Sequence, residues 1–225
     1  MRAFRFPILL LLALGAAEGL LASPCVPALL SVYDGAGFTC QFSGFTLTNF
    51  SYTFVSGTVT IPDSSILVTP VTGPDQLSLA FSSGSWSVSG ANSSKYVLAY
   101  TWDDFGPIRS LEDILNDPVS SPGLAKITTD ICIGAAFAGT VCPTTTTSIT
   151  VFDDDIAPVL SATALFSPPV SILGLRRTIE LDGNTTGSAS LNSLTSQVVV
   201  PEPATIGSGL LALALGLAKL RLERR

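Results

Sequence analysis

The chain has 225 residues, 47% of them hydrophobic and 12% charged, with a formal net charge of −6. It contains no histidine, which excludes Ser-His-Asp and Cys-His nucleophilic catalysis as well as histidine-ligated metal centres. Between residues 24 and 200 there are 14 acidic and five basic residues, a net charge of −9, and nucleic acid is excluded as a partner because phosphate contacts need clustered cations.

The N-terminus has the pattern of a secretory signal. Met1 to Arg5 contains two arginines and no acid, and Phe6 to Ala17 is an apolar run broken only by Pro7 and Gly15. Small residues suited to signal peptidase follow at Ala16 to Gly19. We therefore predict that residues 1–23 are a signal peptide, removed on export.

In the segment that follows, residues 24–200, apolar and polar side chains alternate with the two-residue period of β-strands. After one slip at Ser43-Gly44, large side chains alternate with Ser and Thr between Phe42 and Phe54, as in half-buried strands. The spacing of turn residues, about one turn in 10 residues, predicts an all-β domain, an antiparallel β-sandwich. Further strands are predicted at 56–61, 65–71, 76–82, 85–89, 96–102, 124–131, 148–152, 160–166, 178–181 and 188–194.

One short helix is predicted inside this single domain. Ser110 could cap a helix over Ser110 to Leu115, with Glu112 and Asp113 placed favourably in its first turn. The alternative is an acidic loop.

Four cysteines, an even number in an exported chain, predict two disulfides. Three connectivities are possible. We favour Cys25 with Cys40 and Cys132 with Cys142, because each pair closes a short loop, which stabilises the fold by about 3 kcal/mol in the chain-entropy model.

The remaining candidate sites each have a simpler structural interpretation. The run Asp153, Asp154 and Asp155 could bind calcium, but such a run at a strand end is more often a solvated turn. Trp86 and Trp102 could form a sugar-binding platform, although their positions also suit a sandwich core. No cofactor is expected.

Pairs of neighbouring acidic residues suggest a third and weaker hypothesis, a glycan hydrolase. Asp103-Asp104 and Glu112-Asp113, with the Asp153 run, could supply the two carboxylates of a glycan hydrolase. No GxSxG, P-loop or GxGxxG motif occurs, and the expectation is that the chain is not an enzyme.

The C-terminus carries a second export-related pattern. Pro201, Glu202 and Pro203 precede an uncharged apolar stretch, 206–218, and a tail with four basic residues between 219 and 225. From Ile206 to Leu222 there are 17 residues, about 25 Å of helix, against a bilayer core of about 30 Å. Such a helix spans a membrane only marginally, which suits a sorting signal.

These C-terminal features resemble the PEP-CTERM sorting signal, over residues 201–225. The resemblance implies that exosortase, a membrane enzyme of Gram-negative bacteria, recognises Pro201, Glu202 and Pro203 and removes the tail. It also implies transient anchoring in the inner membrane through residues 206–218, followed by release to the cell surface or extracellular matrix.

The sequence thus leads to three functional hypotheses. The first is a structural or adhesive component of the surface or matrix. The second is a carbohydrate-binding module that contacts extracellular polysaccharide. The third, weaker one is the carboxylate-dependent glycan hydrolase.

Overall fold

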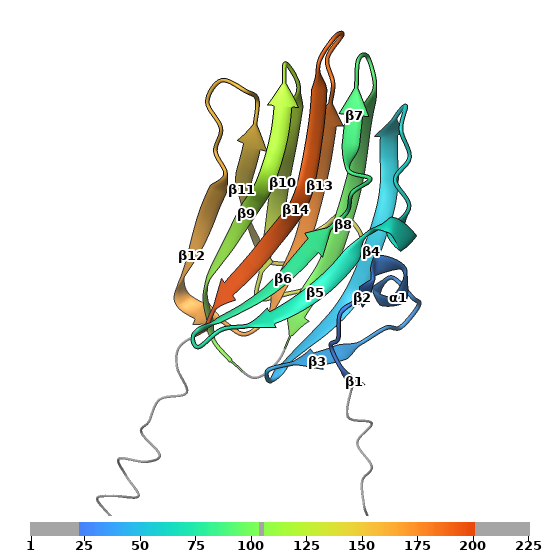
Figure 1. Cartoon of the computed structure of the whole chain (residues 1–225). Coiled ribbons are helices and arrows are strands. Elements are labelled where there is room, and N and C mark those ends of the chain that lie inside the picture. The colour runs from blue at the N-terminus through green and yellow to red at the C-terminus, as the bar shows by residue number, and fades with distance from the viewer. Residues whose placement is uncertain (1–22, 104–105, 201–225) are drawn as a thin grey trace, which may run out of the picture.

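The computed structural model describes residues 23–103 and 106–200, and almost all of this part of the chain is β-strand (Figure 1). The predicted signal peptide, apart from Ser23, and the predicted sorting signal at 201–225 lie outside the described residues. Within those that are described, no helix is long and apolar enough to cross a membrane.

Two sheets face each other, which confirms the predicted antiparallel β-sandwich (Figure 1). Sheet A has the order β1-β3-β4-β8-β13-β10-β11, and all its neighbours are antiparallel except β1 and β3. Its strands are β1 (Ser23–Pro24), β3 (Cys40–Phe42), β4 (Phe45–Gly57), β8 (Ser93–Asp103), β10 (Leu124–Ile133), β11 (Thr145–Asp153) and β13 (Leu173–Asp182).

Sheet B has the order β12-β9-β14-β6-β5-β2, and β7 also pairs with β14. The two short helices, α1 (Leu30–Tyr33) and η1 (Asp63–Ser65), flank the end of this sheet where β2 and β5 pair. Its strands are β2 (Ala28–Leu29), β5 (Leu67–Thr72), β6 (Gln76–Ser82), β7 (Ser87–Ser89), β9 (Ile108–Ser121), β12 (Ser161–Val170) and β14 (Ser188–Val199).

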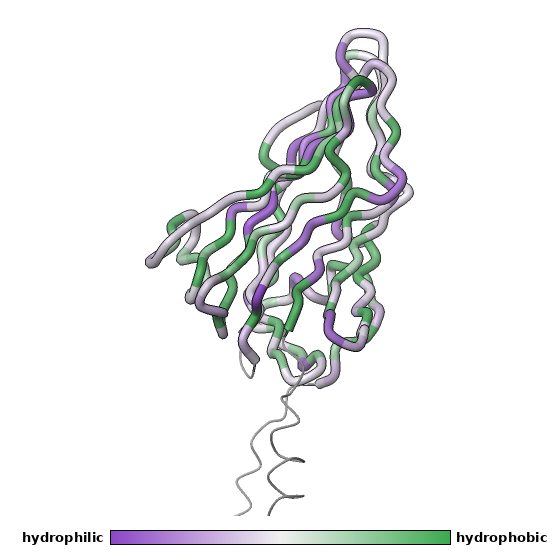
Figure 2. The backbone as a smooth tube through the Cα atoms, turned by 90° about the vertical axis from the view of Figure 1, so that its left-hand side faces the viewer, coloured by the Kyte–Doolittle hydropathy of each residue, from purple (hydrophilic) through white to green (hydrophobic). Residues whose placement is uncertain are grey.

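Alternation along the strands separates core from surface, as Figure 2 shows by the alternating hydropathy of the backbone tube. In β8, for example, Tyr96, Leu98, Tyr100 and Trp102 are all buried between the sheets. The residues between them face outward from sheet A, because successive side chains of a strand point to opposite faces.

The predicted helix at Ser110 to Leu115 is wrong, because these residues belong to β9. Leu111, Asp113 and Leu115 are buried on the inner face, a period of two rather than 3.6. Strand β9 pairs with β14 on one side and β12 on the other, so tertiary pairing overrides the local helix signal. A second prediction also fails, since residues 58–61 lie outside β4 and form no strand.

A charged pair in the middle of the core explains the inward acid of β9. Arg177 of β13 is fully buried, and its Nη2 donates to Asp113 Oδ1 at 3.0 Å, so an ion pair links the two sheets. Thr129 donates to the other oxygen of Asp113, Ser196 accepts from Arg177, and the guanidinium lies 4.9 Å from the ring centre of Tyr100. Burial alone would lower the pKa of Arg177, but Asp113 and Tyr100 hold it above its ordinary value.

Both disulfides have the favoured pairing, Cys25 with Cys40 and Cys132 with Cys142. The first ties the N-terminal segment to β3, and the second closes the loop between β10 and β11. Neither bridge links the two sheets directly, so inter-sheet cohesion rests on the packed core and the buried ion pair.

Candidate functional site

Two hollows that share the lining residue Asn49 adjoin an irregularity in β4, and together they are called the groove. The register between β4 and β8 shifts between Thr48 and Ser51, so β4 has a β-bulge there. Asn49 lies in this bulge with φ +57, a left-handed conformation that few residues other than glycine adopt. Bulges of this kind redirect a side chain, and here the exposed amide of Asn49 is the one redirected.

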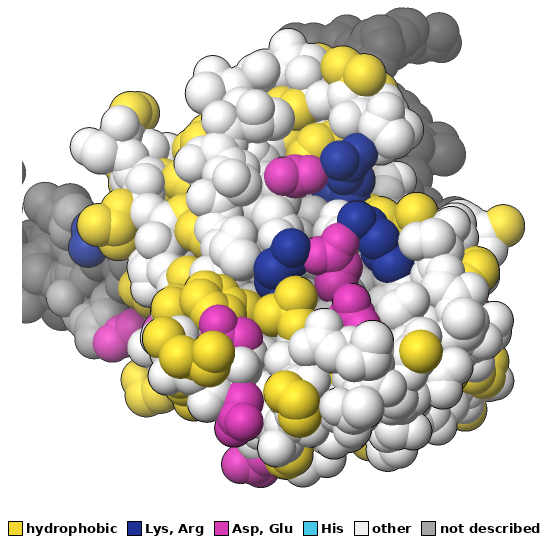
Figure 3. All heavy atoms as spheres, turned by 90° about the horizontal axis from the view of Figure 1, so that it is seen from above, with side chains coloured by type: hydrophobic (Ala, Val, Ile, Leu, Met, Phe, Trp, Pro, Cys, Tyr) yellow, Lys and Arg dark blue, Asp and Glu magenta, His cyan; other side chains and the backbone are white. Residues whose placement is uncertain are grey.

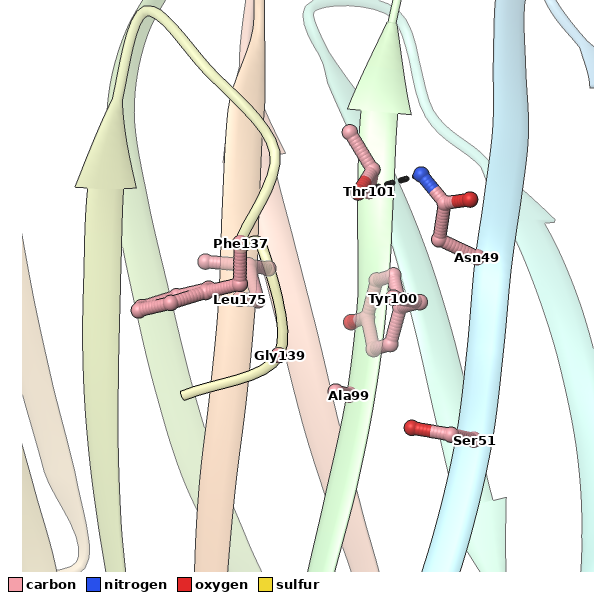
Figure 4. Close-up of a pocket in the computed structure, with 8 residues that line it drawn as sticks. All are labelled: Asn49, Ser51, Ala99, Tyr100, Thr101, Phe137, Gly139 and Leu175. Atoms are coloured by element: carbon pink, nitrogen blue, oxygen red, sulfur yellow. Dashed lines mark hydrogen bonds between the residues drawn. The ribbon is translucent and has the colours of Figure 1, made fainter. Parts of the chain in front are cut away.

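The first hollow beside Asn49 lies over the outer face of sheet A (Figure 4). It has a volume of about 140 Å³ and is lined by Ser51, Thr101, Phe137 and Gly139, among others. The amide nitrogen of Asn49 donates to the Thr101 hydroxyl at 3.3 Å, and its oxygen points away from that threonine (Figure 4). Hydroxyl and amide groups therefore face this hollow from β4 and β8.

The wall of the first hollow is the loop between β10 and β11, which folds back onto sheet A. The Gly174 nitrogen donates to Ala135 oxygen at 3.0 Å, and Arg176 Nη1 donates to Thr140 oxygen at 3.3 Å. A Cβ on Gly174 would lie 2.7 Å from the Ala135 oxygen, so only glycine allows this close approach. The Cys132–Cys142 disulfide closes the same loop.

The second hollow lies on the other side of Asn49, where the segment 34–39 passes the edge of β4. Its volume is about 420 Å³, and its lining includes Asp34, Gly37, Phe38 and Thr48. Burial raises the pKa of Asp34, opposed in part by a hydrogen bond from the Tyr52 backbone. Of the residues that line the two hollows, Asp34 alone is charged.

Ion pairs occupy the outer face of sheet A, and Figure 3 shows acidic and basic side chains in contact on the surface. Glu180 lies between Lys95 and Lys126, 2.6 Å from the latter, and Arg176 pairs with Asp130 at 3.0 Å. The charges on this face are therefore largely neutralised.

The ion pairs of Glu180 predict a pH-dependent contribution to stability. Burial alone would raise its pKa, but hydrogen bonds from Lys126 and Lys95 bring it below the ordinary value of 4.5. A lowered carboxyl pKa stabilises the fold above pH 4.5, and this contribution disappears as the pH falls through the folded-state pKa. We expect Glu180→Gln to lower the free energy of unfolding at pH 7 by under about 1 kcal/mol, and the melting temperature with it. The effect should be smaller near pH 3, because the ion pairs are lost as Glu180 becomes protonated. Thermal melts of both proteins across this range test it, and a constant difference would contradict it.

Trp86 and Trp102 do not form a sugar platform, because both are buried, at 1% and 0% exposure. Trp102 packs against Phe45 with ring centres 5.8 Å apart, so the alternative, core packing, is confirmed. Strand alternation places the indole of Trp102 between the sheets, whereas Trp86 lies in the turn between β6 and β7 and packs inward from there.

Among the residues that it describes, the structure does not bring the predicted acidic residues together into one site. Asp153, the buried last residue of β11, accepts a hydrogen bond from the Asp155 nitrogen, and Asp154 accepts from the nitrogens of Ile156 and Ala157, as in a turn stabilised by its own aspartates. Within residues 23–103 and 106–200 no group of three or more metal-ligating side chains occurs. For the hydrolase hypothesis, Glu112 and Asp113 lie on opposite faces of sheet B, and Asp104 is outside the described residues.

Asn49 was not among the predicted site residues, although the sequence holds a signal for it. Buried large residues occur at Phe45 and Leu47 and then at Phe50, so the alternation slips by one residue at Asn49. Such a slip at an asparagine, which tolerates the left-handed conformation, is typical of a bulge.

No protein-family model matches the sequence, and no curated protein matches it. Among solved structures, the fold is similar to the enzymatically active domain of bacteriophage CBA120 tailspike protein 4, at 12% identity and a TM-score of 0.28, over 71% of this chain and 20% of that one. It is also similar to TmCBM61 in complex with β-1,4-galactotriose, at 10% identity and a TM-score of 0.29. This match covers 69% of this chain and 89% of TmCBM61. A third similar structure is the glycosylation-associated Gap123 complex from Streptococcus agalactiae, at 13% identity and a TM-score of 0.28. This match covers 70% of this chain and 26% of the other. The chain thus spans about a fifth of the tailspike domain.

Proposed function

We propose that this protein is an exported surface or matrix component whose β-sandwich binds carbohydrate in the groove at Asn49. Binding of extracellular polysaccharide would give the domain an adhesive role. The observation that carries the proposal is the bulge in β4, which holds the Asn49 amide between two hollows.

The chemistry of the groove suits a ligand rich in hydroxyl groups. Its side chains include the amide of Asn49 and the hydroxyls of Ser51 and Thr101, which both donate and accept hydrogen bonds. They project from a sheet, and rigid elements hold binding groups more precisely than free loops do.

Binding fits this groove better than hydrolysis. A glycosidase of the usual kind needs two carboxyl groups about 5 to 10 Å apart, one on each side of the scissile bond. Asp34 is the single carboxylate among the residues that line the two hollows, so we propose a non-enzymatic role.

Replacing Asn49 by glycine tests the proposal without disturbing the bulge. Glycine adopts φ +57 freely, so the fold is kept while the amide is lost. We expect polysaccharide affinity to fall about 5- to 100-fold, the equivalent of about 1–3 kcal/mol of hydrogen bonding. Affinity electrophoresis in gels containing neutral polysaccharides, followed by calorimetry, measures it.

Asn184→Gly is the matched control, because Asn184 has φ +55 but lies in a turn outside the groove. It should bind like the wild type. Equal affinity of all three proteins would show that the groove is not the binding site.

Export and exosortase processing form the second part of the proposal. The two disulfides are consistent with an oxidising compartment outside the cytoplasm. We propose that exosortase acts at Pro201, Glu202 and Pro203 after signal peptidase has removed the N-terminal segment, and that residues 206–218 hold the precursor in the inner membrane of a Gram-negative cell.

Intact-mass analysis of the protein from its native cells tests this processing. We expect a mature chain that ends near Pro201 to Thr205 and therefore lacks the basic tail. In Glu202→Ala the tail should be retained, because the central residue of the motif is gone. A wild-type protein that keeps Lys219 to Arg225 would contradict the proposal.

A further inference from the structure

The two hollows of the groove lie on either side of Asn49. Asn49 lines both of them, and it lies in the bulge where β4 departs from regular pairing with β8. A ligand that contacts Asn49 can therefore extend to either side, toward Phe137 on sheet A or toward Phe38 beyond the edge of β4.

Each side of the groove includes a glycine beside open space. Gly139 lines the first hollow and Gly37 the second, and a Cβ added to either would meet no atom within 4 Å. The surface is therefore open beside both glycines. Because neither side is blocked at these glycines, a bound polymer can extend past the groove in both directions, as an internal segment would.

The charges of the groove select against an anionic ligand. Asp34 is its single charged lining residue, and nothing in the lining opposes that negative charge. Two guanidinium groups lie near the lining, and both are already paired. Arg176, 5.7 Å from the Phe137 ring centre, pairs with Asp130, and the fully buried Arg177, 4.9 Å from the Tyr100 ring centre, pairs with Asp113. A uronate placed beside Asp34 would meet like charge, whereas a sugar hydroxyl could donate to its carboxylate.

We propose that the groove binds an internal segment of an uncharged polysaccharide across β4, with Asp34 as the residue that discriminates against acidic polymers. This inference rests on the carbohydrate-binding function proposed above, and it adds the substrate class and a specificity-determining residue.

The test compares neutral glucan, mannan and galactan with the same polymers oxidised at C6 to uronates, using the folded, disulfide-bonded protein. We expect a neutral polymer to bind about tenfold or more tighter than its oxidised form, and its hexasaccharide about tenfold tighter than its disaccharide. In Asp34→Asn, which keeps the shape of the side chain, the preference for the neutral polymer should fall several-fold.

Asp75→Asn is the control, because it removes the same charge from an exposed position outside the groove. Equal affinity for neutral and oxidised polymer, an unchanged preference in Asp34→Asn, or equal affinity for disaccharide and hexasaccharide would overturn this inference and leave carbohydrate binding standing. Failure of every polymer to bind the wild type would overturn the proposed function itself, and this inference with it.

Discussion

Replacing Arg177 by methionine should destabilise the domain by about 3–5 kcal/mol, because it leaves Asp113 as a buried charge without its partner. Asp113 is 1% exposed and Arg177 0%, so water cannot replace the lost ion pair. Chemical denaturation of the oxidised protein measures the change as a lower midpoint with a similar slope.

Two further variants make this prediction specific. Arg176→Met changes the neighbouring residue of β13, whose ion pair with Asp130 lies on the partly exposed outer face, and should cost about 1 kcal/mol or less. Combining Arg177→Met with Asp113→Leu removes both buried charges and should recover much of the loss. Equal destabilisation by Arg176→Met and Arg177→Met would contradict the assigned role of the buried pair.

Trp102→Ala should also destabilise the domain by about 3–5 kcal/mol, through the cavity left by a large buried side chain. Trp102 is fully buried, with the rings of Phe42, Phe45 and Tyr100 around it at centroid distances of 6.0, 5.8 and 6.4 Å. Thermal and chemical unfolding should both show the loss.

Phe54→Ala is the matched control for Trp102→Ala, because Phe54 is an aromatic residue of the same sheet that is 41% exposed. Its replacement should cost clearly less, about 1 kcal/mol. A Trp102→Ala protein with unchanged stability but lost polysaccharide binding would instead mean that this indole contacts ligand.

Strand periodicity was the most reliable guide to the fold, and β9 shows where it failed. Residues 76–82 alternate strictly between large apolar and small or polar side chains, residues 96–102 have a large apolar side chain at every second position, and both segments lie in strands as predicted. In β9 the inward position between Leu111 and Leu115 is Asp113, so a charged residue interrupts the apolar alternation. Only its partner Arg177, 64 residues away in the chain, makes an inward acid tolerable there.

The candidate site was less predictable than the fold. Exposed indoles stack on sugars, but the exposure of Trp102 depends on which face of β8 turns inward, and that of Trp86 on how the turn between β6 and β7 packs. The slip in alternation at Asn49 indicates a bulge but not a site. The site depends on three segments that meet around Asn49: β4, the loop after β10 and the segment before β3.

The all-β class, the favoured disulfide pairing and the lack of histidine chemistry could all be predicted from the sequence. These depend on composition, short loops and the two-residue period of strands, which are local properties. Tertiary structure alone decided the burial of Trp86 and Trp102, the inter-sheet ion pair and the groove at Asn49. Each of these results from contacts between segments far apart in the chain, and such contacts exist only once two sheets have been brought face to face.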